Sequence, residues 1–586
     1  MEPVSLTIGV VGFAVQCFDA IVSVMTLLQN LRDADNRTAL LGCKLQIEQH
    51  ILLIWGREHG MKDGTLATRI PEESQQRLVL VILQSMLALI GESDKLRLKY
   101  GIEHVAELPA RSNTNSQHEL GLRTEAQAAS SVPLANFTYM HISSTDSDQA
   151  AMPSSETADA TKKRLQSWRT SLPLLRKCSW VVKDAKKFEE LIDNLRYFNE
   201  SLVRLTNTRT QTVMAASNAL LSNCSTAGMQ TLAAASSAQY PEMASAAVLG
   251  STVAEADRMG DQVQRSNPTS QRQRDMRILT DQLQLAHKSA SRALTTAVFA
   301  SPTSGEQNVI IQWRVFQSSL DPLTRPKTIR RIEGTARVLS QAKPASICVL
   351  DCCGYVCQDD KMGYVFSYPS GCSSHRTPRT LFQMIDSSSG SRHNVPPPPL
   401  ETRMELAKKL CTTIYWIHVS GIVHKGIRSD NVLLFRWGAE CTERITDPFL
   451  IGFDHSRRDD DATVTRTASS PEQDMYRHPD ALFSESMRST KLQDLYSLGL
   501  VLLEIGSWFS LRQLAGDTHV SELRDHLLAD GGPVSQLPYR MGTRYMEMVK
   551  LCIQGSFDID EDEVRGNAVQ EAFLKEVIEE IIKIRV

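Results

Sequence analysis

The first hundred residues combine a continuous apolar stretch with two segments of helical periodicity. Ser5 to Leu28 is a run of 24 residues whose only charge is Asp19, so it is long enough to form a membrane-spanning helix. Apolar residues then recur every three or four positions around 39–55 and again over 75–98. This pattern predicts a group of long helices, with the apolar stretch as the first of them.

The helical pattern is interrupted and then resumes. Residues 107–161 lose the periodicity and are rich in Ser, Thr, Ala and Asp, which predicts a disordered insertion. From Leu165 to Leu202 apolar residues return at helical spacing, enough for two more helices. We therefore predict an all-α helical bundle over 1–205.

The middle of the chain changes in composition. Residues 206–303 are rich in Ala, Ser, Gln and Thr, and small side chains of this kind form weak helices or a mobile linker. This segment contains no recognisable chemistry. We predict that it links two domains.

Residues 304–586 begin with strand patterns and continue with helical ones. The segments NVIIQWRVF, CVLDCCGYV and GYVFSYP alternate as strands do, and a helix with Leu406, Leu410, Ile414 and Ile417 on one face follows. Strands followed by helices predict a two-lobed α+β domain. The fold class is thus multidomain, with a helical bundle followed by an α+β domain.

Two interpretations of Ser5 to Leu28 stay open. No Lys or Arg precedes the stretch to set its orientation, and Gln16 and Asp19 lie in its middle, where a charge is costly in lipid. A buried first helix of the bundle is therefore favoured over permanent insertion.

Composition and charge describe an ordinary soluble protein. The 64 Lys and Arg nearly balance the 67 Asp and Glu, leaving a formal net charge of -3, so no basic field is available to hold nucleic acid. Twelve cysteines in a chain of this length, without a cleavable signal, indicate reduced thiols in a cytoplasmic protein.

The densest cysteine group lacks the spacing of a metal site. It comprises Cys348, Cys352, Cys353 and Cys357, with Cys372 and His375 further on. Zinc sites use two short ligand pairs separated by a spacer. We expect these cysteines to be small apolar side chains, and we predict no metal site.

Two segments of the first domain carry a family resemblance. MEPVSLTIGVVGFAVQCFDAIVSV and RKCSWVVKDAKKFEELIDNLRYFNESL resemble the fungal HeLo domain, the prion-inhibition and propagation domain of heterokaryon-incompatibility proteins. The resemblance implies a helical bundle whose apolar first segment is released toward a membrane in some members. It covers roughly 1–205, and the prion-forming repeat of some relatives is absent.

Four segments of the second domain resemble a protein kinase. GIVHKGIRSDNVLLF, PFLIGFDHSR, MYRHPDALF and KLQDLYSLGLVLLEIGSW follow the order of the catalytic loop, the magnesium loop, the end of the activation segment and the central helix. The same combination resembles the divergent kinase-like domain that accompanies fungal HeLo domains. Asp494 then takes the place of the aspartate that anchors the catalytic-loop backbone, a structural role.

The catalytic positions depart from the kinase pattern. At the H-R-D site the chain has His424, Lys425 and Gly426, so the carboxylate that orients the acceptor hydroxyl is missing. Arg428 and Asn431 keep the cation and the metal-facing amide of that loop.

The nucleotide positions depart as well. The metal-binding aspartate of the D-F-G motif is replaced by Gly452, and Asp454 lies two residues later, too far for the same coordination. No glycine-rich loop precedes the strands. Arg314 is the candidate for the strand lysine and Glu333 for its helix partner, with solvated surface charge as the alternative for both.

These features lead to one expected function and two alternatives. We expect a non-catalytic signalling or incompatibility-type protein whose pseudokinase domain controls a HeLo effector that engages a membrane through residues 5–28 or binds a protein partner. ATP is the expected ligand, with or without magnesium. An active Ser/Thr kinase that uses Asp430 or Asp454, and a purely structural adaptor, are the alternatives. We expect a cytoplasmic protein that associates with membranes on activation.

Overall fold

The computed structural model describes most of the chain and divides it into two compact units. The described residues are 3–29, 36–90, 96, 99–100, 102–106, 178–262, 276–285, 294–301, 305–315, 324–358, 361–373, 377–389, 396–438, 442–453, 456–458, 471–483, 490–559 and 567–585. Unit 1 is Met1–Tyr240 and unit 2 is Pro241–Val586.

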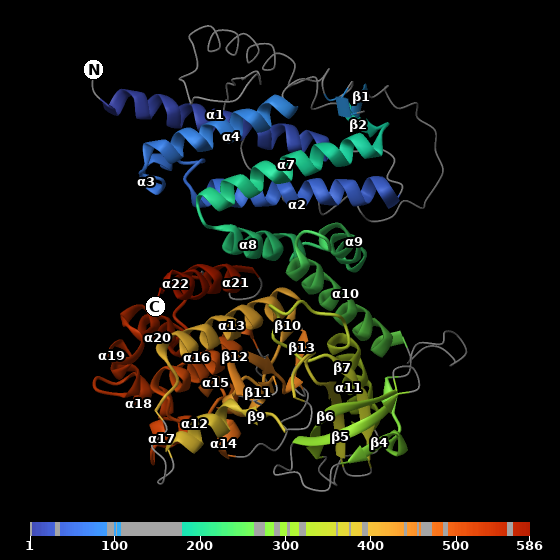
Figure 1. Cartoon of the computed structure of the whole chain (residues 1–586), viewed down its shortest axis with the longest axis vertical. Helices are drawn as coiled ribbons and strands as arrows, with labels where there is room; N and C mark the ends of the chain where they lie inside the picture. The colour runs from blue at the N-terminus through green and yellow to red at the C-terminus, as the bar shows by residue number, and fades with distance from the viewer. Residues whose placement is uncertain are drawn as a thin grey trace. The chain divides into compact units, whose positions relative to one another are not determined.

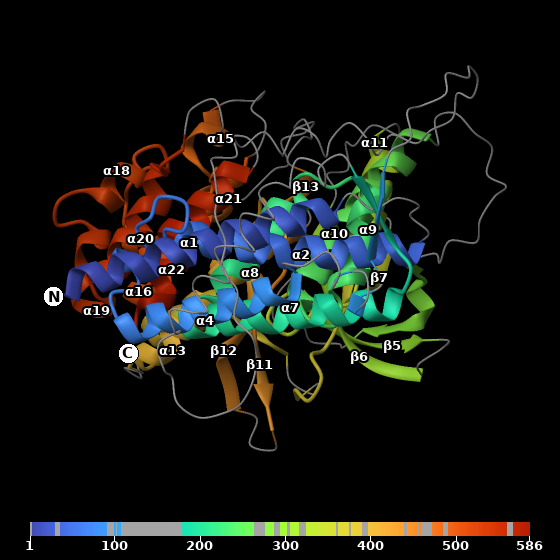
Figure 2. The ribbon, with the colours of Figure 1, turned by 90° about the horizontal axis from the view of Figure 1, so that it is seen from above.

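Unit 1 is a bundle of helices with one short antiparallel ribbon (Figure 1). Its elements are α1 (Pro3–Leu28), α2 (Asn36–Glu58), α3 (Leu66–Arg69), α4 (Glu73–Ile90), β1 (Ile102–Ala106), β2 (Cys178–Val182), α7 (Ala185–Leu205), α8 (Arg209–Leu221) and α9 (Thr226–Ser236). Helix α1 packs on α4, α2 packs on α7, and α4 also packs on α7 (Figure 2). The predicted helical bundle is confirmed for this part of the chain.

The apolar first helix packs against its neighbours over its described side chains. Ala14, Phe18, Ile21 and Met25 recur at helical spacing and are all buried. Gly56 allows α2 to pack closely on α1, because a Cβ at this position would lie 2.1 Å from the Phe18 ring. In the part of the chain that the structure describes, Val11–Leu28 is also the one helix long and apolar enough to cross a membrane, and just over half of it is buried.

One predicted helix is wrong. We expected two helices between Leu165 and Leu202, but Cys178–Val182 forms strand β2, which pairs antiparallel with β1 from Ile102↔Val182 to Ala106↔Cys178. The run of Trp180 with two valines favours a strand once a partner strand is available. The predicted insertion at 107–161 lies outside the described residues.

The junction between the units differs from the predicted one. Helices α8 and α9 belong to unit 1, and unit 2 begins with α10 (Pro241–Gln262), so the compact units meet at Tyr240 and not at 205. Small residues that suggested a linker are instead buried in helices, as at Ala216 and Ala246. Small side chains allow close helix packing, which composition alone does not distinguish from a linker.

A six-stranded sheet occupies the first part of unit 2, in the order β4-β5-β6-β8-β7-β3. Its strands are β3 (Arg277–Ile278), β4 (Leu283–Leu285), β5 (Leu294–Ser301), β6 (Gly305–Val315), β7 (Cys352–Cys357) and β8 (Lys361–Ser367). All pairs are antiparallel except β3 with β7. The 3₁₀ turn η2 (Thr280–Gln282) joins β3 to β4, and α11 (Thr324–Leu339) lies between β6 and β7 in the sequence.

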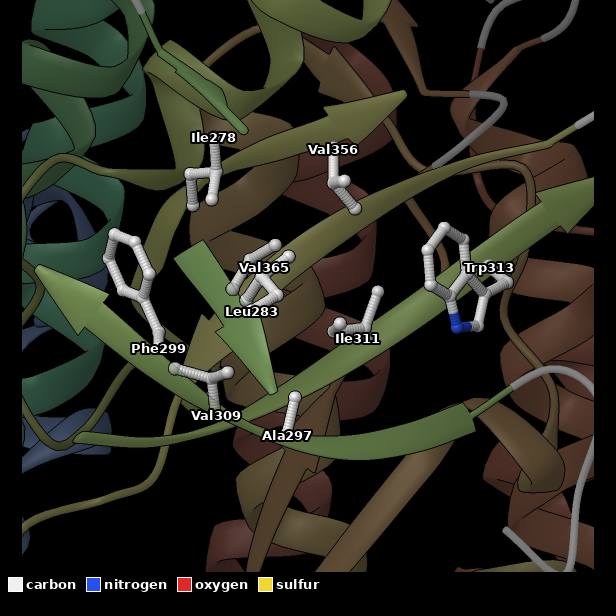
Figure 3. Close-up of a cluster of buried hydrophobic side chains, with 9 residues drawn as sticks. All are labelled: Ile278, Leu283, Ala297, Phe299, Val309, Ile311, Trp313, Val356 and Val365. Carbon is white, nitrogen blue, oxygen red and sulfur yellow. The ribbon is translucent and has the colours of Figure 1, made fainter. Parts of the chain in front are cut away.

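One face of this sheet carries an apolar cluster (Figure 3). Strand β6 contributes Val309, Ile311 and Trp313, and β8 contributes Val365 to the same cluster. Because alternate residues of a strand point to opposite faces, the intervening residues of β6 belong to the other face. That other face positions part of the candidate site.

The rest of unit 2 is mostly helical. Its helices are α12 (Leu381–Ser389), α13 (Leu400–Val419), η3 (Ser429–Asn431), α14 (Pro471–Asp474), α15 (Pro479–Phe483), α16 (Lys491–Ser507), α17 (Leu511–Ala515), α18 (Leu523–Leu528), η5 (Pro533–Gln536), α19 (Pro538–Met541), α20 (Thr543–Gln554), α21 (Asn567–Phe573), the π-helix η7 (Leu574–Ile578) and α22 (Glu579–Lys583). Its strands are β9 (Arg379–Thr380), β10 (Ile422–Val423), β11 (Val432–Trp437), β12 (Thr442–Leu450) and β13 (Arg457–Arg458). Helix α13 packs on α16 and on β12. A sheet followed by helices confirms the predicted α+β class.

Candidate functional site

A buried aspartate organises the loop between β10 and η3. Asp494, in the first turn of α16, is 1% exposed. Its carboxylate accepts hydrogen bonds from the backbone N–H of His424 at 2.6 Å and of Lys425 at 2.8 Å, and from Nε2 of His418 at 3.0 Å. Burial alone would raise the pKa of Asp494, but its interactions with His418 and His424 lower it below the ordinary value.

A residue far along the sequence orients His418. The side-chain amide of Gln570, on α21, lies 3.0 Å from Nδ1 of His418, and Gln570 is buried. If the amide donates there, Nε2 of His418 carries the proton that reaches Asp494. The sequence motifs did not identify Gln570, because it is more than seventy residues from Asp494 and lies in no motif.

The two positions at which the kinase resemblance would place carboxylates are glycines that lie against each other. A Cβ at Gly426 would come within 2.6 Å of the carbonyl oxygen of Gly452. Gly452 has φ +94°, and a Cβ there would lie 2.1 Å from Nδ2 of Asn431. Both positions therefore require glycine in this arrangement, one for space and the other for space and backbone conformation.

Asn431 fills the space beside both glycines. Its Nδ2 donates to the carbonyl of Gly426 at 2.7 Å, and its own carbonyl accepts from the N–H of Ile451 at 2.9 Å. Arg428 lies on the same turn, with Nη2 3.5 Å from Oδ1 of Asn431, and forms an ion pair with Asp430 at 2.6 Å. The predicted loop residues thus come together, while Asp454 lies outside the described residues.

The strand residue that reaches this loop is Gln312, which the sequence analysis missed. Its Oε1 accepts a hydrogen bond of 3.1 Å from the backbone N–H of Gly452. The predicted Arg314 lies two residues further along β6, on the same face by alternation, and Glu333 forms an ion pair with Arg337 one turn along its own helix at 2.9 Å. The signal available in the sequence was a polar residue flanked by Ile311 and Trp313.

The loop is also stabilised by a histidine and a phenylalanine. The rings of His424 and Phe453 have centroids 4.3 Å apart, and Nδ1 of His424 accepts from the N–H of Gly426 at 3.1 Å. Burial lowers the pKa of His424 to about 4, so the ring is neutral at physiological pH. A neutral, enclosed imidazole that accepts from its own loop has a structural role here.

A second buried carboxylate, that of Glu504, contacts the loop through Ser429. Oε1 of Glu504, on α16, accepts from Tyr476 Oη at 2.8 Å, from Ser429 Oγ at 3.2 Å and from the N–H of Leu511 at 2.8 Å. Burial raises the pKa of Glu504 to about 7. This network joins three places: the loop at Ser429, the segment that follows α14 at Tyr476, and α17 at Leu511. The sequence did not predict it, because its members lie in different elements.

Unit 1 has its own buried carboxylate. Glu48 of α2 accepts from Nε of Arg196 at 2.9 Å, from Nδ2 of Asn199 at 3.0 Å and from Oη of Tyr240 at 3.1 Å. Burial raises the pKa of Glu48, and these partners offset that only in part. The network fastens α2 to α7 and to the last residue of the unit.

Asp19 is the charged residue within α1. It is half-buried, and burial raises its pKa to about 7, with the charge of Lys62 acting in the opposite direction. An acid with this pKa is partly neutral at physiological pH while α1 is packed in the bundle.

The residues at Gly426 and Gly452 do not fit magnesium. Mg²⁺ in phosphoryl-transfer sites is held by carboxylate oxygens together with the phosphates. Here the position that the resemblance assigns to the metal-binding carboxylate is Gly452, and Asn431 occupies the direction of its Cβ. The position that it assigns to the base is Gly426, whose Cβ would lie 2.6 Å from the carbonyl oxygen of Gly452. In the part of the chain that the structure describes, no group of His, Cys, Asp and Glu is arranged to hold a metal ion.

Comparison with known proteins gives one family-model match and one similar relative. Residues 5–232 match the family model HeLo, described as prion-inhibition and propagation, which confirms the HeLo part of the prediction and extends it beyond 205. A relative named as an inactive receptor-like protein kinase, from Arabidopsis thaliana, is 27% identical over 151 residues, which is 26% of this chain. The match spans 22% of that relative's length. This similarity is to a kinase-like protein.

Proposed function

We propose that unit 2 is a pseudokinase that controls the HeLo unit in a heterokaryon-incompatibility type of signalling. The observation that carries this proposal is the contact between Gly426 and Gly452. Phosphoryl transfer needs a carboxylate near the acceptor hydroxyl and another on the metal, and neither position has room for a side chain. The similarity to a relative that is named as an inactive kinase also supports the proposal.

The retained anchor supports a kinase-like scaffold without catalysis. Asp494 still holds the backbone of His424 and Lys425, and Asn431 still holds the carbonyl of Gly426. These contacts serve the shape of the loop and need neither a base nor a metal. A domain that keeps the kinase-like loop but lacks its catalytic groups is suited to binding and signalling. We propose ATP as its ligand, bound with or without magnesium.

The HeLo unit is the proposed effector. Its helix α1 is long and apolar enough to cross a bilayer, and Asp19 is the one charged residue within it. We place the protein in the cytoplasm, with membrane association or binding of a protein partner on activation, and with no nucleic-acid role.

Two assays test this proposal. Incubation of the full chain with labelled ATP and magnesium or manganese should give no phosphate transfer beyond that of Asn431→Ala. Dye-loaded anionic vesicles should leak on addition of the chain ending at Tyr240 and leak less with the full chain. Transfer that disappears in Asn431→Ala would establish the active kinase instead, and vesicles untouched by the chain ending at Tyr240 would leave a structural adaptor.

Gly12 offers a matched pair of variants for the vesicle assay. It is exposed, and a Cβ there meets nothing within 4 Å, so the fold tolerates a side chain. Gly12→Glu adds a charge to α1 that opposes insertion, whereas Gly12→Ala does not. Equal leakage by the two variants would show that α1 does not enter the bilayer.

A further inference from the structure

Gln312 is a buried polar side chain that lies between two apolar residues of β6. It is 5% exposed, and its neighbours Ile311 and Trp313 belong to the apolar cluster on one face of the sheet (Figure 3). Alternation directs Gln312 to the opposite face. A buried amide is costly unless it is hydrogen-bonded, so its partner there is significant.

That partner is a backbone group held from three sides. The N–H of Gly452 donates to Oε1 of Gln312 at 3.1 Å, the carbonyl of Gly452 faces Gly426, and Asn431 lies along its Cβ direction. The preceding N–H, of Ile451, is bonded to the carbonyl of Asn431 at 2.9 Å. One hydrogen bond therefore connects the six-stranded sheet to a loop that is fixed on its other side.

Catalytic kinases connect these two places through a ligand. A lysine on the strand before the helix contacts the phosphates, the phosphates contact the metal, and the aspartate of the magnesium loop holds the metal. In this chain the strand before helix α11 carries Gln312, and the loop position carries Gly452. The amide reaches the backbone directly, with no charge on either side.

We propose that Gln312 is a positioning residue that closes the sheet onto the Gly452 loop without a nucleotide. The closed arrangement is then a property of the chain, and ligand binding is not needed to form it. This inference rests on the proposed function, because it takes unit 2 to be kinase-like. It adds that the signalling state of the loop is set by this hydrogen bond and not by ATP with magnesium.

Hydrogen exchange in the full chain tests the bond where it forms. We would follow the exchange of a peptide that contains Gly452 by mass spectrometry in Gln312→Leu, Gln312→Asn and Gln312→Glu. Leu removes the acceptor and Asn is too short to reach, so both should speed exchange of the Gly452 amide by at least about tenfold. Glu keeps an acceptor oxygen at the same reach and should stay near the wild-type rate.

The controls separate the bond from general loss of stability. Gln307→Leu, on the same strand, removes a contact of 3.5 Å to Sγ of Cys353 and should leave the Gly452 amide protected. If Gln312→Leu does not fold, Gln312→Asn decides. Equal exchange in Gln312→Asn, Gln312→Glu and the wild type would overturn the assignment.

The same hydrogen-exchange measurement with added ATP tests the inference separately from the proposed function. ATP, with and without magnesium, should change neither the exchange of the Gly452 amide nor its dependence on Gln312. Protection that appears only with ATP and magnesium would overturn the inference. Phosphate transfer by a chain whose Gly452 amide is protected without ligand would instead overturn the proposed function and leave the hydrogen bond standing.

Discussion

Asp494 of helix α16 and the glycines Gly426 and Gly452 border the same loop and contribute to it in different ways. At Asp494 a buried carboxylate accepts three hydrogen bonds. At Gly426 and Gly452 there is no side chain, and the space that one would need is occupied by the carbonyl oxygen of Gly452 and by the side chain of Asn431, respectively. Asp494 fixes the backbone of the loop, whereas Gly426 and Gly452 leave no carboxylate at the two positions where the kinase resemblance would place one. The residue that holds the loop in shape is therefore separate from the positions that phosphoryl transfer would use.

Removal of the anchor should have the largest effect. Asp494→Ala leaves the N–H groups of His424 and Lys425 without their acceptor in a buried site, and we expect a loss of about 3–5 kcal/mol in the free energy of unfolding of unit 2. Chemical denaturation of the full chain measures it. Asp517→Ala, at an exposed position, is the control, and similar midpoints for the two variants would contradict the role of Asp494 as an anchor.

A side chain at position 452 should lower the free energy of unfolding by somewhat less. Gly452→Ala combines a strained backbone with a contact of 2.1 Å, and we expect a loss of about 3 kcal/mol. Gly421→Ala is matched, because Gly421 has φ +78° and open space, so only the strain of about 1 kcal/mol remains. A denaturation series that ranks the two variants equally would show that the space beside Asn431 is not restrictive.

The pH dependence of stability should distinguish Glu504 from Asp494. The pKa of Glu504 is raised from 4.5 to about 7, so the folded chain holds a proton that the unfolded chain releases between these values. The free energy of unfolding should therefore fall as pH rises through this window, by at most about 1.4 kcal/mol per pH unit. Stability curves of the wild type minus Glu504→Gln isolate this slope. Parallel curves would show that Glu504 does not titrate there.

The smallest effect should come from unit 1. Tyr240→Phe removes one donor from Glu48 while Arg196 and Asn199 remain, and we expect a loss of about 1 kcal/mol. Tyr197→Phe is the control, because Tyr197 is 68% exposed. Thermal melts of the chain ending at Tyr240 compare the two, and a larger loss at Tyr197 would contradict this account of Tyr240.

Local patterns predicted the elements better than the site. The periodicity around 39–55 and 75–98 anticipated α2 and α4, and alternation anticipated β6, β7 and β8, because burial on one face leaves a direct mark on the sequence. The segment at Trp180 was mispredicted because a short apolar run fits both periods. Its partner strand, β1, is more than seventy residues earlier.

The site was predictable only where a motif carried it. Asp494 and Asn431 were found because their neighbours resemble kinase segments. Gln312, Gln570 and Glu504 were not, because each acts through contacts between elements that are distant in sequence. Arg314 was chosen because it carries the positive charge expected of the strand lysine, and the neutral Gln312, on the same face of β6, was not considered.

The paired glycines also limit which single substitutions this loop can accept. A carboxylate placed at 426 alone would collide with the carbonyl of Gly452, and one placed at 452 alone would collide with Asn431. Under the proposed function, each single substitution toward a catalytic site therefore gives a less stable protein that has no activity for selection to act on. The contact between the two glycines would then keep the loop in its present form over evolutionary time.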